Sequence, residues 1–187
     1  MGAQQLEPPP PAQPPPPAPL APVTPTTTSN AIELSRVTSN QAPEFCPRVS
    51  PNGKQILFHA FDTSKVNSSG TRFNEGWSII HIDIDSPGRR LAAGPYAHAP
   101  AWYPDGQNFV YESIKMPRPV LVRTPIGNVG MTFISPQPLG AMDNMPDVSP
   151  DGKKIAFHTT MGESIQLCTV ENNGANFTVY VEGFYPR

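Results

Sequence analysis

From residue 44 onward, short apolar stretches of the chain are separated by clusters of proline, glycine, asparagine and aspartate. Within many of these stretches apolar and polar residues follow one another with a period of two, which is typical of strands that bury one face. No segment shows the 3.6-residue period of an amphipathic helix. The pattern therefore predicts an all-β protein.

Three stretches of this pattern repeat one another. Residues 46–59, 99–112 and 145–158 read CPRVSPNGKQILFH, APAWYPDGQNFVYE and MPDVSPDGKKIAFH, and the first prolines of successive copies lie 53 and 46 residues apart. In the shared Pro-Asn/Asp-Gly turn, proline presets φ and glycine supplies a positive φ at low cost. We therefore expect each copy to form a hairpin of two antiparallel strands.

Two further strands are expected after each hairpin. Four short strands that recur every ~45 residues are typical of the blades of a β-propeller. The polar, Gly/Ser-rich segment 62–74 is then a long insertion between the second and third strands of the first unit. The expected third strands are 77–84, 120–125 and 164–170, and the expected fourth strands are 90–92, 131–134 and 177–180.

The repeat also resembles that of a known family. SPDGKKIAF at 149–157, preceded by Pro146, is similar to the TolB-type (WD-like) β-propeller repeat, which occurs in TolB and in the propellers of prolyl-oligopeptidase-like and tricorn-type proteases. Asn52 and Tyr103 are departures from it. The resemblance implies a partial β-propeller of three four-stranded antiparallel blades. The expected repeats are about 44–97, 98–143 and 144–183, with the start of a further one at 184–187.

Three blades are too few to close a ring, since propellers close with about four to eight. Either the chain is part of a longer propeller, or partners or a second copy cap its open edges.

The first residues have a different composition. Of the 26 prolines in the chain, 11 lie in residues 1–25. Proline lacks an N–H donor and favours an extended polyproline II conformation. We expect residues 1–37 to be a disordered Pro-rich tether and residues 38–187 to form the blades. The tether is interpreted as a spacer, as a docking peptide for an SH3-like or WW-like partner, or as a linker without a partner.

Charge and hydropathy argue against nucleic-acid binding and against a transmembrane helix. The net charge is −2 without a block of Lys or Arg, which argues against nucleic-acid binding. No apolar run reaches the ~18–20 residues of a transmembrane helix, and no secretory signal is visible. The resemblance implies a periplasmic or cell-envelope-associated protein, and a cytoplasmic one is the alternative.

Three polar residues occupy equivalent positions of the repeat: His59, Glu112 and His158. One interpretation is a polar ring near the propeller axis that binds a ligand or metal, and the other is a set of hydrogen-bonded strand residues between blades. Residues 162–166, Gly-Glu-Ser-Ile-Gln, lack the second glycine of a nucleophile elbow. We therefore predict no catalytic residues, no cofactor and no metal site.

The functional hypothesis is a non-catalytic protein–protein interaction or scaffold module of a cell-envelope assembly. Its expected partners are envelope lipoproteins or another propeller chain, and Arg72, Phe73 and Trp77 are the candidate contact residues, in or next to the long insertion. The alternative is the propeller portion of a prolyl-oligopeptidase-like serine peptidase whose catalytic domain is absent from this chain.

Overall fold

The chain divides into two units, Met1–Ser35 and Arg36–Arg187. The computed structural model describes residues 38, 43–62, 76–86, 88–115, 118–127, 130–134, 142–161 and 164–182, all of which belong to the second unit. The predicted tether, residues 1–37, lies outside the described residues, as do Arg72 and Phe73.

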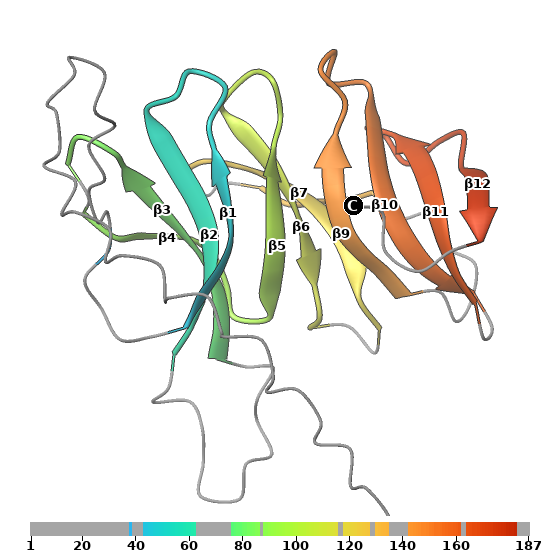
Figure 1. Ribbon diagram of the computed structural model, residues 1–187, viewed down its shortest axis with the longest axis horizontal. Coiled ribbons are helices and arrows are strands. Elements are labelled where there is room, and N and C mark those ends of the chain that lie inside the picture. The colour runs from blue at the N-terminus through green and yellow to red at the C-terminus, as the bar shows by residue number, and fades with distance from the viewer. Residues whose placement is uncertain are drawn as a thin grey trace, which may run out of the picture. The chain divides into compact units, whose positions relative to one another are not determined.

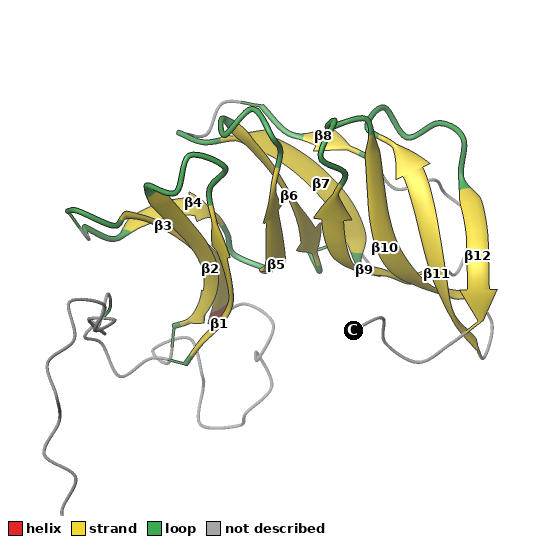
Figure 2. Ribbon diagram, turned by 45° about the horizontal axis from the view of Figure 1, so that its top comes forward, coloured by secondary structure: helices red, strands yellow, loops and turns green. Residues whose placement is uncertain are grey.

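The described elements are strands, and they form three four-stranded antiparallel sheets that follow one another along the unit (Figures 1 and 2). This confirms the predicted all-β class and the three blades. Blade 1 comprises β1 (Glu44–Val49), β2 (Gln55–Phe61), β3 (Trp77–Asp83) and β4 (Arg90–Ala93). Blade 2 comprises β5 (Ala97–Trp102), β6 (Asn108–Ser113), β7 (Val120–Pro125) and β8 (Thr132–Phe133). Blade 3 comprises β9 (Met142–Val148), β10 (Lys154–Met161), β11 (Ser164–Glu171) and β12 (Thr178–Glu182).

The predicted turns join the first and second strands of each blade. Gly53, Gly106 and Gly152 have φ values of 72°, 62° and 72°, the left-handed region that glycine enters without a steric penalty. Each glycine N–H donates to the carbonyl three residues earlier, over 2.8 to 3.0 Å. The Pro-Asn/Asp-Gly sequence therefore sets the hairpin geometry, as expected.

The side chain that accepts a hydrogen bond across the turn differs in the second copy. In blade 3 the hydroxyl of Ser149 accepts from the backbone N–H of Lys154 at 2.9 Å, and in blade 1 the hydroxyl of Ser50 accepts from that of Gln55 at 2.9 Å. Tyr103 stands at this position in blade 2, where the Asp105 carboxylate accepts from the equivalent backbone N–H, that of Asn108, at 2.9 Å. The Tyr103 ring is buried, with the guanidinium of Arg123 4.8 Å from its centroid.

A bulge interrupts the first strand of each blade. Cys46, Ala99 and Met145 have φ values of 50°, 43° and 49°, and each precedes the first proline of its repeat. The pairing register between first and second strands shifts around these residues in all three blades. The bulge therefore recurs with the sequence repeat, although the three residue types differ.

Two apolar cores hold neighbouring blades together. Leu57 and Ile79 of blade 1 belong to one core with Phe109 and Tyr111 of blade 2. Val110 of blade 2 belongs to the next core, which reaches into blade 3. Because β6 is buried on both faces, the apolar residues Phe109, Val110 and Tyr111 follow one another at its centre without a polar residue between them.

Candidate functional site

The ends of the first strands meet in an open hollow of about 310 Å³. β1 lies beside β5 and β5 beside β9, and each strand ends at the Pro-containing turn of its blade. The repeat therefore brings equivalent positions of three blades to one place. We call this region the three-blade hollow; its lining residues are Arg48, Val49 and Pro51 from blade 1, Trp102 and Pro104 from blade 2, and Asp147, Val148 and Pro150 from blade 3.

The hollow combines a fixed floor with an exposed rim. The Trp102 side chain is only 8% exposed, and its indole Nε1–H donates to the main-chain carbonyl of Arg48 at 2.9 Å. Val49 is 58% exposed, and the Arg48 and Asp147 side chains, of opposite charge, are also at the surface. A mainly apolar concave surface with charged residues at its edge is typical of protein–protein contact sites.

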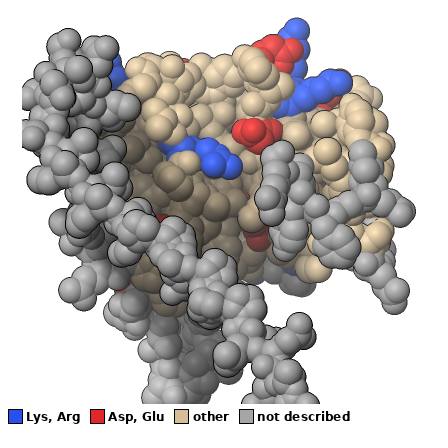
Figure 3. Space-filling view, viewed as in Figure 1, with Lys and Arg blue, Asp and Glu red and all other residues tan. Residues whose placement is uncertain are grey.

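Apolar side chains continue along the first strands away from the hollow. Phe45 on β1 and Met142 and Met145 on β9 are exposed. In the view of Figure 3 most of the visible surface of the described residues is uncharged, and at the upper right basic and acidic side chains lie close to one another. We call these three residues together with Val49 the inner-strand surface; its apolar character favours contact with another protein.

Two members of the predicted polar trio, His59 and Glu112, form hydrogen bonds between blades. The Nδ1 atom of His59 accepts from the backbone N–H of Ala99, on the bulge of the next blade, at 2.9 Å. The Glu112 carboxylate accepts from the backbone N–H of Met145, the equivalent bulge residue one blade further on. For these two residues the geometry favours the inter-blade interpretation over an axial ring.

The third member, His158, is buried on β10 of blade 3. Among the described residues, no three His, Cys, Asp or Glu side chains are grouped so that they could hold a metal ion.

The inter-blade positions have shifted proton affinities because they are buried. Desolvation lowers the pKa of His59 to about 4, since a charged imidazolium is poorly solvated there. The same cause raises the pKa of Glu112 to about 7, while the Met145 N–H acts in the opposite direction. The imidazole is thus neutral around pH 7, as its acceptor role requires.

Trp77, the candidate contact residue that the structure describes, lies in the interior. It is 7% exposed and packs in a cluster of rings, with His59, Phe61 and His98 at centroid distances of 4.9, 4.9 and 5.1 Å. The structure does not bring it to the surface beside the three-blade hollow. Sequence reasoning missed the hollow, although its signal was present: Val49, Trp102 and Val148, which line it, immediately precede the three repeated turns.

Comparison with solved structures gives the same architecture. A TolB-type protein from Agrobacterium tumefaciens is similar with a TM-score of 0.67 and 18% identity, over 79% of this chain and 52% of that chain. TolB from Acinetobacter baumannii is similar with a TM-score of 0.62 and 22% identity, over 76% and 33%. Prolyl oligopeptidase B from Galerina marginata is similar with a TM-score of 0.56 and 15% identity, over 76% and 22%.

At these identities the likeness shows the fold, part of a β-propeller, and the chain spans about half or less of each of these proteins. No protein-family model and no curated protein sequence matches the chain. Within the described ranges no helix is long and apolar enough to cross a membrane.

Proposed function

We propose that this chain is a non-catalytic protein–protein interaction module of a cell-envelope assembly, and that it binds its partner at the three-blade hollow and the inner-strand surface. The observation that carries the proposal is the convergence of three repeat ends on one open, mainly apolar hollow with Arg48 and Asp147 at its rim. A folded scaffold that presents such a surface needs no reacting group to function.

The fold comparisons support this reading, because two TolB structures are similar with TM-scores of 0.67 and 0.62. In this proposal the partner is an envelope lipoprotein or another propeller chain, the compartment is the periplasm, and segment 1–37 is a spacer. The insertion with Arg72 and Phe73 remains a predicted second contact, outside the described residues.

A photo-crosslinking amino acid at position 49 tests the proposal in cells of the source organism. We expect a discrete adduct with an envelope protein from position 49, and none from the control position 91, because Leu91 is equally exposed but lies on the outer strand β4. Equal adducts from both positions, or none from either, would contradict the proposal. A second variant, Arg48→Glu, should reduce the yield at position 49 by changing the rim charge.

The second candidate function is the propeller portion of a serine peptidase, which the similarity to a prolyl oligopeptidase favours. In that case a hydrolase sequence with a Gly-x-Ser-x-Gly elbow, followed by Asp and His, should lie in the same reading frame. Sequencing the flanking coding DNA separates the two functions. A frame that contains only further blades would leave the interaction module as the sole candidate.

A further inference from the structure

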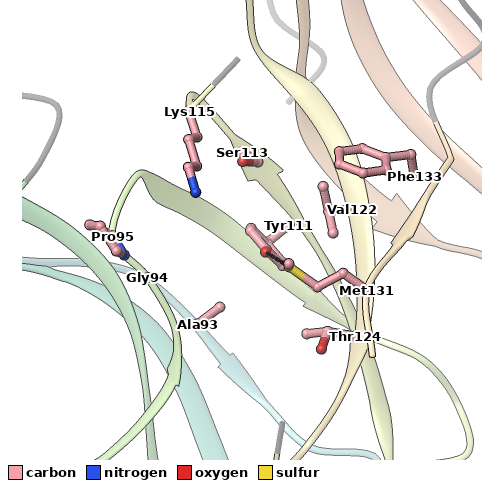
Figure 4. Close-up of a pocket in the computed structure, with 10 residues that line it drawn as sticks. All are labelled: Ala93, Gly94, Pro95, Tyr111, Ser113, Lys115, Val122, Thr124, Met131 and Phe133. Atoms are coloured by element: carbon pink, nitrogen blue, oxygen red, sulfur yellow. Dashed lines mark hydrogen bonds between the residues drawn. The ribbon is translucent and has the colours of Figure 1, made fainter. Parts of the chain in front are cut away.

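A second cavity, of about 310 Å³, lies between blades 1 and 2, away from the three-blade hollow (Figure 4). Its origin is a difference between equivalent positions. Ala93 pairs with Ile79 on the outer strand of blade 1, whereas Ile134, bonded through its N–H to the carbonyl of Leu121, occupies the corresponding place in blade 2. Ile134 is 1% exposed and fills the space between blades 2 and 3. The smaller alanine leaves that space open between blades 1 and 2.

The walls of the cavity are mostly apolar. Tyr111 and Val122 form the inner wall and are buried, whereas Met131 and Phe133 are 64% and 61% exposed and form the mouth. The hydroxyl of Thr124 donates to the carbonyl of Gly130 at 3.0 Å, so this polar group is already used by the protein. The cavity can therefore hold the apolar part of a ligand, and it is open to solvent at one side.

One cation stands at this apolar site. The ammonium end of Lys115 points between Pro95 and Tyr111 in Figure 4, and the lining includes no carboxylate. Within the described ranges Lys115 makes no ion pair. A ligand with a negative group near Lys115 and an apolar body against Phe133 would satisfy both features.

We propose that this cavity binds a carboxylate carried on a single aromatic or branched apolar group. The volume lies at the lower end of the range of ligand pockets, about 300–1,000 Å³, which limits the ligand to roughly the size of one amino-acid residue. Two sources share this chemistry: a free organic acid, and the C-terminal residue of a peptide. The proposal is independent of the proposed function, since it concerns a different surface of the blades.

The test is a titration of the full chain with phenylacetate, in which binding is monitored by two-dimensional ¹H–¹⁵N NMR. We expect saturable shifts at residues 93, 115 and 133, with a dissociation constant in the millimolar range that about ten ligand atoms can support. Phenylacetamide, which lacks the charge, should bind about 3- to 10-fold more weakly. The peptide acetyl-Gly-Gly-Phe, as free acid and as C-terminal amide, then tests whether the ligand is a peptide. If the free acid binds more tightly than phenylacetate, the ligand is the C-terminal residue of a peptide.

Two variants locate the site independently of each other. Lys115→Gln should weaken phenylacetate about 3- to 10-fold while leaving phenylacetamide unchanged. Ala93→Ile should abolish binding of both, because it recreates the filling seen at Ile134, and its unfolding midpoint should not fall. Lys54→Gln, at an exposed turn, is the matched control and should change nothing. Equal affinity for acid and amide, or undiminished binding in folded Ala93→Ile, would overturn the proposal.

Discussion

The indole Nε1–H of Trp102 donates a hydrogen bond to the main-chain carbonyl of Arg48 over 2.9 Å, so that one aromatic side chain joins the first strands of two blades. Trp102 also belongs to the apolar core between these blades. The same residue thus supports both the blade interface and the floor of the three-blade hollow.

Replacing Trp102 by Phe should lower the free energy of unfolding by about 1–3 kcal/mol, because the carbonyl of Arg48 loses its donor and the smaller ring leaves a void. Urea denaturation followed by circular dichroism measures the change. Tyr180→Phe, an exposed site on β12, is the control and should remain within about 0.5 kcal/mol of the parent. A Trp102→Phe protein as stable as that control would contradict the role of the bond.

Stability should decrease in mild acid because of the two histidines between blades 1 and 2. Burial lowers the pKa of His59 to about 4, and burial together with the charge of His59 lowers that of His98 to about 4. Their imidazole rings lie 5.4 Å apart, centroid to centroid. The unfolded chain, with histidine pKa values near 6.5, binds protons first. The favourable contribution is therefore complete above about pH 6.5 and is lost as the pH falls toward 4.

Urea midpoints at pH 7.5, 5.5 and 4.5 test this prediction. His98→Gln should flatten the acid side of the profile, and His59→Asn should do so while its amide oxygen, which stands where Nδ1 was, still accepts from the Ala99 N–H. Profiles of both variants that run parallel to the parent would exclude these two residues as the cause.

Glu112 should affect stability in the opposite direction. Its pKa in the folded state is raised to about 7, chiefly by burial, so its contribution is present below the unfolded value near 4.5 and is lost as the pH rises through 7. Glu112→Gln keeps an oxygen acceptor for Met145 without the charge, and should stabilise the protein at pH 8 by about 1–3 kcal/mol while changing little at pH 5. Thermal unfolding at both pH values measures this difference, and a loss of stability at pH 8 would contradict it.

Two glycines with positive φ should differ in their tolerance of alanine. Gly53, with φ +72°, has open space where a Cβ would stand, so Gly53→Ala should cost only the left-handed backbone strain of about 1–2 kcal/mol. Gly174, with φ +87°, would place its Cβ 2.9 Å from the carbonyl oxygen of Ile134. Gly174→Ala should therefore cost about 1–3 kcal/mol more than Gly53→Ala, which chemical denaturation of the pair can measure. Equal losses would mean that the contact with blade 2 relaxes freely.

The strands and turns were predictable because their signals are local. Period-two alternation and the Pro-Asn/Asp-Gly turns locate the hairpins, and the expected third strand 120–125 coincides with β7. The fourth strands were less accurate: 131–134 was expected in blade 2, but β8 spans Thr132–Phe133, and 177–180 was expected in blade 3, where β12 spans Thr178–Glu182. Edge strands pair on one side only, so their ends depend on few hydrogen bonds.

The features between blades could not be predicted, because they depend on which residues face each other across a sheet-to-sheet gap. Tyr103 is a departure from the repeat, yet it fills the interface with blade 3, while Asp105 takes over the hydrogen bond that serine makes in the other two turns. Likewise, Ala93 and Ile134 are both ordinary apolar residues of outer strands, and only their equivalent placement reveals why one interface contains a cavity.

His59 and Glu112 each accept a hydrogen bond from a main-chain N–H of the next blade, that of Ala99 and that of Met145. A peptide N–H is present in every amino acid except proline, so the donor positions 99 and 145 can change side chain without losing the contact. The side chain that makes this inter-blade hydrogen bond is therefore specified by the second strand alone. A blade that is exchanged by recombination needs its own acceptor side chain but no particular donor residue in the next blade.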